Sequence, residues 1–366
     1  MLKAGIVGLP NVGKSSLFNA LTRQAVAAEN YPFCTVEPNI GMVEVADPRL
    51  DTVFRYTRSP RRVAAVVQFV DIAGLVRGAS EGEGLGNRFL GHIREVDAVV
   101  HVLRCFHDPD VTHVLGGVDP ARDREIVNTE LMIADLESVE RRLDRLGRRV
   151  RSGDAEVGRE AALLERVRNG LAGGTPARHV EVRPAEVALL RTFHLLTSKP
   201  VLYVTNVDEQ SLPDGDNEWT SEVREVLRRA EPDAGLVCIS SDVEAELAGL
   251  ATSERDEFLE MLGLAEPGVH RVVRATYDVL GVITFFTTNE KESRAWTIPR
   301  GTRAPEAGGT IHSDFLRGFI RAETIGYDDF ARVGSLRAAR EQGLIRSEGK
   351  EYVVRDGDLI LFRFNV

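Results

Sequence analysis

The sequence predicts an α/β protein built on a mostly parallel sheet, and three observations support this class. Short apolar runs rich in β-branched residues alternate with helical patterns, at residues 4–7, 40–45, 64–70, 98–103, 201–204 and 236–239. Several runs lack polar alternation, as expected for strands covered on both faces. A glycine-rich stretch, residues 8–15, joins the first run to the first helical pattern, and ligands of such sheets bind at the carboxyl ends of strands.

Composition indicates a soluble globular protein of two or three domains. The chain has 366 residues, of which 43% are hydrophobic and 28% are charged, and both fractions are ordinary for this class. No apolar run approaches the roughly 20 residues that cross a bilayer. The first strand pattern follows Met1 too closely for a signal peptide. We therefore expect a cytoplasmic protein with no membrane partner.

The three cysteines agree with a reducing compartment, because they are too few and odd in number for a disulfide framework. Cys105 and Cys238 lie in apolar runs, so we expect them to be buried and inert. Cys34 lies in a polar loop, and the sequence leaves open whether its thiol is reactive.

An insertion interrupts the strand order between residues 106 and 201, since one strand–helix–strand unit needs only about 30 residues. Its apolar residues step by three and four along two seams, and Pro184 can open a third helix. We predict an inserted helical domain at residues 121–196, folded as an antiparallel coiled-coil hairpin, which divides a nucleotide-binding domain into residues 1–120 and 197–280. The seam residues are Leu136, Val139, Leu143, Leu146, Val150, Val157, Ala161, Leu164 and Leu171.

Arginines gather near the predicted tip of this hairpin. A net charge of −10 argues against general polyanion binding, and hence against DNA as a partner, but it does not exclude a local basic patch. The cluster is either a solvated helical face or an RNA contact, and both interpretations stay open. Its members are Arg141, Arg142, Arg145, Arg148, Arg149 and Arg151.

The last part of the chain, residues 281–366, has short strand patterns and one helical pattern, which predict a small α+β domain. We expect Thr310 to cap a short helix that continues through His312 and Phe315.

Residues 8–15 read GLPNVGKS, the G-x-x-x-x-G-K-S pattern of the phosphate-binding P-loop. Its glycines let backbone N–H groups turn toward a polyphosphate, and the helix that follows adds a positive partial charge. Lys14 is predicted to reach the β- and γ-phosphates during catalysis, and Ser15 to ligate Mg²⁺. The predicted phosphate-contacting residues are Asn11, Val12, Gly13, Lys14, Ser15 and Ser16.

A D-x-x-G motif, from Asp71 to Gly74, ends the third strand pattern. In this motif the aspartate holds Mg²⁺ through water, and the glycine amide meets the γ-phosphate. A threonine hydroxyl in the intervening loop, that of Thr35, can complete the Mg²⁺ shell and sense the γ-phosphate. We therefore predict Ser15, Thr35 and Asp71 as the metal ligands and Gly74 as a nucleotide contact.

Leu75 stands where many GTPases have the glutamine that orients the attacking water. Leucine cannot do this, which leaves three alternatives: a remote side chain, a monovalent cation such as K⁺ near Asn11, or a partner. Among the side chains we predict His113 as the catalytic residue that positions the water, because it follows the fourth strand on the nucleotide side.

Residues 206–209 read NVDE and take the place of the guanine-reading N-K-x-D motif. The carboxylate of Glu209 would crowd the guanine edge, whereas the backbone of Val207 can meet the N6 donor of adenine. We predict relaxed or adenine-favouring recognition, with Asn206, Val207 and Glu209 at the base. Ser240, at the end of the last strand pattern, is predicted to close the base pocket.

Together these motifs resemble the YchF / Obg-like ATPase family, and the resemblance extends over the whole chain. Its more specific parts are residues 206–209, 294–299, 314–330 and 356–366. It implies a Ras-like nucleotide domain, the inserted helical domain, and a C-terminal TGS domain of β-grasp fold at residues 281–366. It also implies hydrolysis of ATP in preference to GTP, a ribosome as partner, and a catalytic histidine in the loop of His113. Leu75 matches the family's hydrophobic replacement for glutamine.

We therefore predict an ATPase switch, in which ATP and Mg²⁺ order the loops of Thr35 and Gly74 and hydrolysis releases them. The helical arm and the TGS domain would pass this change to a ribosome. One alternative is a GTPase of the same fold. Another is a nucleotide-gated ribosome- or RNA-binding module with incidental hydrolysis, which Leu75 favours.

Overall fold

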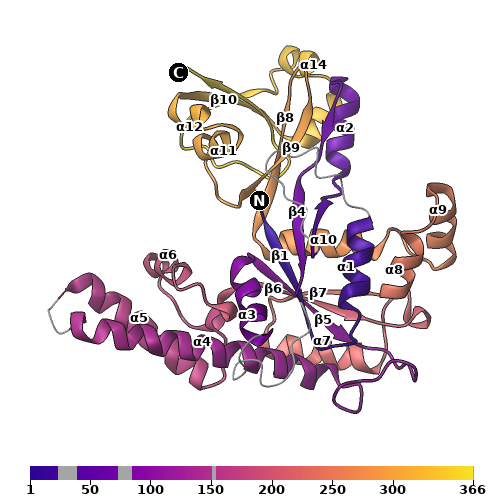
Figure 1. Ribbon diagram of the computed structural model, residues 1–366. Coiled ribbons are helices and arrows are strands. Elements are labelled where there is room, and N and C mark those ends of the chain that lie inside the picture. The colour runs from indigo at the N-terminus through magenta and orange to yellow at the C-terminus, as the bar shows by residue number, and fades with distance from the viewer. Residues whose placement is uncertain (24–38, 73–84, 151–153, 366) are drawn as a thin grey trace. The chain divides into compact units, whose positions relative to one another are not determined.

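The computed structural model describes residues 1–23, 39–72, 85–150 and 154–365, without the side chains of residues 85–88, 148–150 and 252. These residues form two compact units (Figure 1). The first unit comprises residues 1–43 and 68–276, and the second comprises residues 44–67 and 277–366.

The first unit is built on a six-stranded sheet with the order β2-β4-β1-β5-β6-β7. The pairings from β4 through β1, β5 and β6 to β7 are all parallel, and every residue of β5 is buried. The predicted α/β class is confirmed, and the carboxyl ends of five strands meet at one edge. The strands are β1 (Lys3–Val7), β2 (Ile40–Glu44), β4 (Val66–Asp71), β5 (Ala98–Arg104), β6 (Val201–Asn206) and β7 (Gly235–Ile239).

Helices of the first unit follow its strands or form the inserted arm. The arm consists of two long helices that lie side by side, α4 (Pro120–Val150) and α5 (Ala155–Ala172) (Figure 1). Their apolar seams meet in a buried core around Val139, Leu163 and Val167. The other helices are α1 (Lys14–Arg23), α3 (Leu85–Glu95), α6 (Val187–Arg191), α7 (Glu218–Ala230), α8 (Ser241–Leu247), α9 (Thr252–Met261) and α10 (Gly268–Val279), which runs on into the second unit.

A buried ion-pair network joins the root of the arm to the sheet. Glu231, which follows α7, accepts from Arg178 at 2.7 Å and from the Tyr203 hydroxyl at 2.8 Å. Arg124 of α4 donates to Oε1, the same carboxylate oxygen that accepts from Tyr203. Removing one partner of such a network leaves an uncompensated buried charge, which costs about 3–5 kcal/mol. The first turns of α4 are therefore firmly held beside β6, the strand that ends at Asn206.

The second unit contains a six-stranded sheet with the order β11-β10-β12-β8-β9-β3. Its strands are β3 (Arg62–Val63), β8 (Val282–Thr288), β9 (Ser293–Pro299), β10 (Phe319–Ile325), β11 (Arg346–Glu348) and β12 (Leu359–Phe364). Its helices are α2 (Pro48–Thr57), α11 (Ala304–Ile311), α12 (Ser313–Arg317), α13 (Tyr327–Val333) and α14 (Leu336–Glu341).

Residues 44–67 group with this second unit, whereas the sequence suggested that they belong with the nucleotide-binding domain. Two long-range contacts account for the grouping. Strand β3 pairs with β9, and Arg49 of α2 forms an ion pair with Asp356 at 2.7 Å. Local sequence patterns cannot reveal either contact.

One local prediction fails, and another is confirmed only in part. Thr310 does not cap a helix, because it lies inside α11, and the N-cap of the next helix is His312, whose side chain accepts from the Asp314 N–H. The predicted third helix does begin at Pro184, as a turn of 3-10 helix that continues into α6, but it is short and ends at Arg191.

Both described cysteines are free thiols. Cys105 is buried as predicted, whereas Cys238 is only partly buried, and desolvation raises the pKa of each. Among the helices that the structure describes, none has the length and apolar character needed to cross a membrane.

Candidate nucleotide-binding site

The loop between β1 and α1 has the backbone of a phosphate cradle. Gly8 and Gly13 have φ angles of 151° and 98°, which glycine adopts without strain. A Cβ on Gly8 would lie 2.6 Å from the Val102 carbonyl oxygen, and a Cβ on Gly13 would overlap the Asn206 side chain. Helix α1 begins at Lys14, so its free N–H groups face this loop.

Lys14 is a buried cation that lacks an anionic partner within the described residues. It is 7% exposed, and its Nζ donates to the Leu9 carbonyl at 2.7 Å. Desolvation lowers the pKa of Lys14 to about 8, against the opposing influence of Asp71. Because a buried charge is costly without a counter-ion, a polyphosphate would supply what this site lacks.

The two predicted metal ligands that the structure describes lie together. Ser15 Oγ is 3.2 Å from Asp71 Oδ2, across the gap between the P-loop and the end of β4. Mg²⁺ prefers oxygen ligands and retains several waters, and a hydroxyl beside a carboxylate suits it. The described residues hold no cluster of three or more His, Cys, Asp or Glu side chains for a metal. Thr35, Gly74, Leu75 and Cys34 lie outside the described residues.

The side chain of Asn206 stabilises the P-loop through two hydrogen bonds. Its Nδ2 donates to the Val12 carbonyl at 3.0 Å, and its Oδ1 accepts from the Ser241 N–H at 2.8 Å. It is 3% exposed, so its amide is committed to these two bonds. Asn206 thus ties the P-loop to the ends of β6 and β7.

The next three residues separate into different roles. Val207 is buried, and its N–H donates to the Ile239 carbonyl at 2.8 Å, which leaves its own carbonyl as the group that can face a base. Asp208 accepts from the Ser211 N–H and hydroxyl, at 3.0 and 2.7 Å. Glu209 is exposed. Of the two neighbouring carboxylates, Asp208 is used to cap a turn and Glu209 remains available.

Ser240 and Ser241 provide unused polar groups at the end of β7. Both are 2% exposed, and neither hydroxyl has a hydrogen-bond partner among the described residues. A Cβ on Gly13 would lie 3.1 Å from Ser241 Oγ, so this hydroxyl borders the P-loop. Buried hydroxyls without partners are unfavourable, and a bound nucleotide would relieve this.

His113 lies in the loop after β5 but is held by the arm. Its Nε2 is 2.8 Å from Asp123 Oδ2 in the first turn of α4, and its Nδ1 accepts from the Leu115 N–H at 3.2 Å. The side chains of His113 and Asp123 are 5% and 2% exposed. Both ring nitrogens are engaged, so this arrangement leaves neither free for a water.

Two residues shape this loop, and the sequence pointed to Asn11 but not to Arg104. Arg104, 2% exposed at the end of β5, donates to the carbonyls of Phe106, Asp108 and Val111. Asn11 Nδ2 donates to the Thr112 carbonyl at 3.0 Å, which connects the P-loop to the same segment. A buried arginine that bonds only to carbonyls has no local sequence pattern that could have revealed it.

These features define a P-loop nucleotide-binding protein with an inserted helical arm and a separate C-terminal sheet unit. A family model described as a 50S ribosome-binding GTPase matches residues 3–136, and one described as YchF-GTPase_C, a protein of unknown function (DUF933), matches residues 282–365.

Relatives of known name match the chain from end to end. It is 48% identical to the ribosome-binding ATPase YchF of Bacillus subtilis over 100% of both chains. It is 40% identical to the Obg-like ATPase 1 of Gallus gallus over 100% of this chain and 92% of that one. The solved structure of the Schizosaccharomyces pombe YchF GTPase superposes with a TM-score of 0.87 at 36% identity, over 99% of this chain and 97% of that one. The chain belongs to the YchF family, which confirms the resemblance found in its motifs.

Proposed function

We propose that this chain is a ribosome-binding ATPase, which hydrolyses ATP to ADP and phosphate as a nucleotide-dependent switch. The observation that carries this proposal is 48% identity over both full lengths to a protein of that name. The P-loop geometry supports it, because Lys14 is buried without an anion and Ser15 lies beside Asp71.

The predicted phosphate site uses backbone N–H groups and one metal. The N–H groups of residues 11–16 would face the phosphates, and Lys14 would neutralise the β- and γ-phosphates. Ser15, Asp71 and Thr35 would hold Mg²⁺, which when bound neutralises charge on the transferred phosphoryl group. Gly74 would contact the γ-phosphate.

Selectivity for ATP over GTP would come from the segment after β6. Because Asp208 caps its own turn, Glu209 is the carboxylate that would stand at the base edge, where it is too long for guanine. The free carbonyl of Val207 would accept from adenine N6, and Ser240 would border the base pocket. The S. pombe relative is named a GTPase, so a GTPase of the same fold stays the alternative.

Catalysis would use His113 to position the attacking water, since Leu75 cannot. The bond from Asn11 to the Thr112 carbonyl keeps this loop near the P-loop. Asn11 donates with Nδ2, and the same side chain retains an oxygen that could ligate a monovalent cation such as K⁺ beside the phosphates. His113 must leave Asp123 before it can act on a water.

The ribosome is the proposed macromolecular partner. Because ribosomes are cytoplasmic, we also propose that the chain is cytoplasmic. We propose RNA contacts through the arm and the C-terminal unit.

Calorimetry with non-hydrolysable ATP and GTP analogues, together with phosphate release, tests the enzyme. Lys14→Ala should abolish hydrolysis, whereas the matched variant Lys291→Ala, at an exposed loop position, should leave it unchanged. Equal affinity for the two analogues would contradict the proposed selectivity for ATP. If the protein does not bind ATP in the presence of Mg²⁺, the proposal that it is an ATPase is wrong.

A second candidate is a nucleotide-gated binding module with incidental hydrolysis. The engaged ring nitrogens of His113 favour it, because they predict slow turnover without a partner. Ribosomes that stimulate turnover support the enzymatic cycle. The binding module is supported if ribosomes leave the slow turnover unchanged and if the protein sediments with ribosomes in a nucleotide-dependent way.

A further inference from the structure

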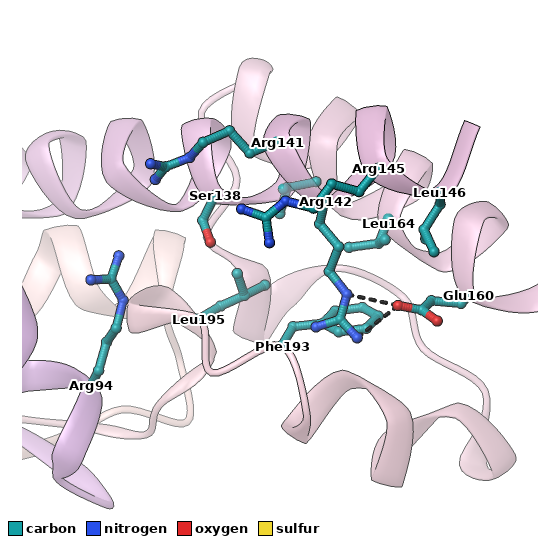
Figure 2. A pocket seen from close by; sticks show the side chains of 11 residues that line it. Arg94, Ser138, Arg141, Arg142, Arg145, Leu146, Glu160, Leu164, Phe193 and Leu195 are labelled. Carbon is teal, nitrogen blue, oxygen red and sulfur yellow. Dashed lines mark hydrogen bonds and ion pairs between the residues drawn. The ribbon is translucent and has the colours of Figure 1, made fainter. Parts of the chain in front are cut away.

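A pocket of about 560 Å³ opens on the helical arm, and none of its lining residues belongs to the nucleotide site. Its walls come from α3, one face of α4, α5 and the segment after α6 (Figure 2). Sites for small molecules occupy about 300–1,000 Å³. The pocket is therefore large enough for a small organic ligand.

The floor of the pocket is apolar and closely packed. Phe193 and Leu195 are 7% and 1% exposed, and the Arg142 guanidinium carbon lies 4.5 Å from the centre of the Phe193 ring. Behind the floor, the buried carboxylate of Asp135 accepts from the Leu196 N–H at 2.8 Å and so holds the segment after α6 against α4. A floor fixed in this way is preformed, which lowers the entropy lost on binding.

Three arginines at this pocket form no ion pair within the described residues, although the charge of Arg94 acts on the buried carboxylate of Asp135. Arg94, Arg141 and Arg145 form no ion pair with any carboxylate in the described parts of the chain, and Ser138 and Leu195 lie between them in Figure 2. Unpaired arginines are not the rule on this arm. The arginines of the arm that do pair with glutamates are Arg142, Arg159, Arg166 and Arg168. Positive charge is thus concentrated at one concave site of a chain whose net charge is −10.

We propose that this pocket binds a small organic phosphate, with the phosphoryl group held by Arg94, Arg141 and Arg145 and the apolar part against the exposed edge of Phe193 and the aliphatic stems of the arginines. A planar guanidinium matches phosphate oxygens in paired hydrogen bonds. A phosphate monoester carries close to two negative charges at neutral pH. It therefore neutralises more of the charge of three arginines than a carboxylate, which carries one.

The shape of the site favours a small ligand over an RNA strand. Each phosphodiester of RNA carries a single charge, and these charges are spread along the strand, whereas the pocket gathers three guanidinium groups at one concave site. A phosphorylated ring compound would use both the charged rim and the floor.

The ligand would also join two elements of the fold. Arg94 belongs to α3, and Arg141 and Arg145 belong to α4, so a ligand bonded to Arg94 and Arg145 links the two helices. The site is separate from the P-loop.

The test uses the full chain with Mg²⁺ and a saturating non-hydrolysable ATP analogue, so that the nucleotide site is filled. Naphthyl phosphate, a fluorescent aromatic phosphate monoester, is titrated by calorimetry and fluorescence, and naphthol and inorganic phosphate serve as probes that each lack one half of it. We expect saturable binding of naphthyl phosphate at one site and much weaker binding of the two half-probes. Arg145→Ala and Arg94→Ala should each weaken binding at least about tenfold.

The control is Arg159→Ala on the same arm, where the arginine is exposed and outside the pocket; its affinity should match that of the unaltered chain. Arg145→Lys should recover part of the affinity, and thermal melting confirms that each variant is folded. The proposal is overturned if naphthyl phosphate does not saturate, or if Arg159→Ala weakens it as much as Arg145→Ala does. It is equally overturned if a single-stranded RNA decamer binds through Arg94 and Arg145 while naphthyl phosphate does not.

Discussion

His113 and Asp123 form a buried pair that joins the loop after β5 to the first turn of α4. The Nε2–Oδ2 distance is 2.8 Å, and both side chains are almost fully buried. Because His113 Nδ1 accepts from the Leu115 N–H, the proton of the neutral ring is on Nε2 and is donated to the carboxylate. We predict that this contact restrains turnover, since His113 cannot orient a water while both nitrogens are occupied.

The perturbation is Asp123→Asn, which keeps the shape and an acceptor oxygen but removes the charge. Hydrogen bonds to charged groups contribute about 1.5–3 kcal/mol and neutral ones about 0.5–1.5 kcal/mol, so the pair should weaken by about 1 kcal/mol. The population with a released His113 then rises about fivefold. We expect kcat for ATP to increase by up to that factor with KM unchanged.

Steady-state phosphate release measures this effect, and two variants make it specific. Asp110→Asn, at an exposed position of the same loop, should leave kcat unchanged. Adding His113→Ala to Asp123→Asn should remove the gain. A decrease in kcat on Asp123→Asn alone would refute the reasoning, because Asp123 would then orient a productive His113.

Three further predictions concern other contacts. Asn206→Ala leaves the Val12 carbonyl and the Ser241 N–H without their partner and should lower the free energy of unfolding by about 2–4 kcal/mol, with weaker ATP binding in calorimetry. Glu209→Asp should raise GTP affinity by roughly fivefold, or about 1 kcal/mol, and an unchanged ATP-to-GTP ratio would count against its place at the base. Burial would raise the pKa of Asp356, but hydrogen bonds from Arg49 and from the Thr284 N–H outweigh it and lower the pKa. The stability that this carboxylate contributes is therefore present above its ordinary pKa of 3.8 and is lost as the pH falls through its lower folded value. Asp356→Asn should cost about 1 kcal/mol near neutral pH, because the pair is half exposed, and the variant and the unaltered chain should converge in stability in acid.

The P-loop could be predicted from the sequence because its chemistry is local. Positive φ at Gly8 and Gly13, the start of a helix at Lys14, and the hydroxyl of Ser15 all follow from one contiguous pattern. The proximity of Asp71 was also predictable, since parallel strands end at one edge of the sheet. The arm was predictable for a similar reason, because its seams have a regular helical period.

Other parts of the site depend on contacts between distant residues. Asn206 was predicted to contact the base, but its side-chain amide bonds to the Val12 carbonyl and the Ser241 N–H. These bonds depend on how closely β6 approaches the P-loop, which the sequence does not reveal. A turn that ends at Ser211 engages the carboxylate of Asp208 and leaves that of Glu209 available for a base. The orientation of His113 depends on Asp123, which lies in a helix of the insertion.

By itself the sequence determined that a triphosphate-binding loop follows the first strand, that a helical arm interrupts the sheet, and that the chain belongs with the YchF proteins. Those properties depend on residues close together along the chain, whose backbone geometry and periodicity are fixed by neighbours. Only the tertiary structure decided that residues 44–67 group with the C-terminal unit, that Asp123 holds His113, and that Arg94 and Arg145 border one pocket. The physical reason is that burial, ion pairing and cavity shape are set by residues far apart in the chain, and no local pattern records which of them will meet.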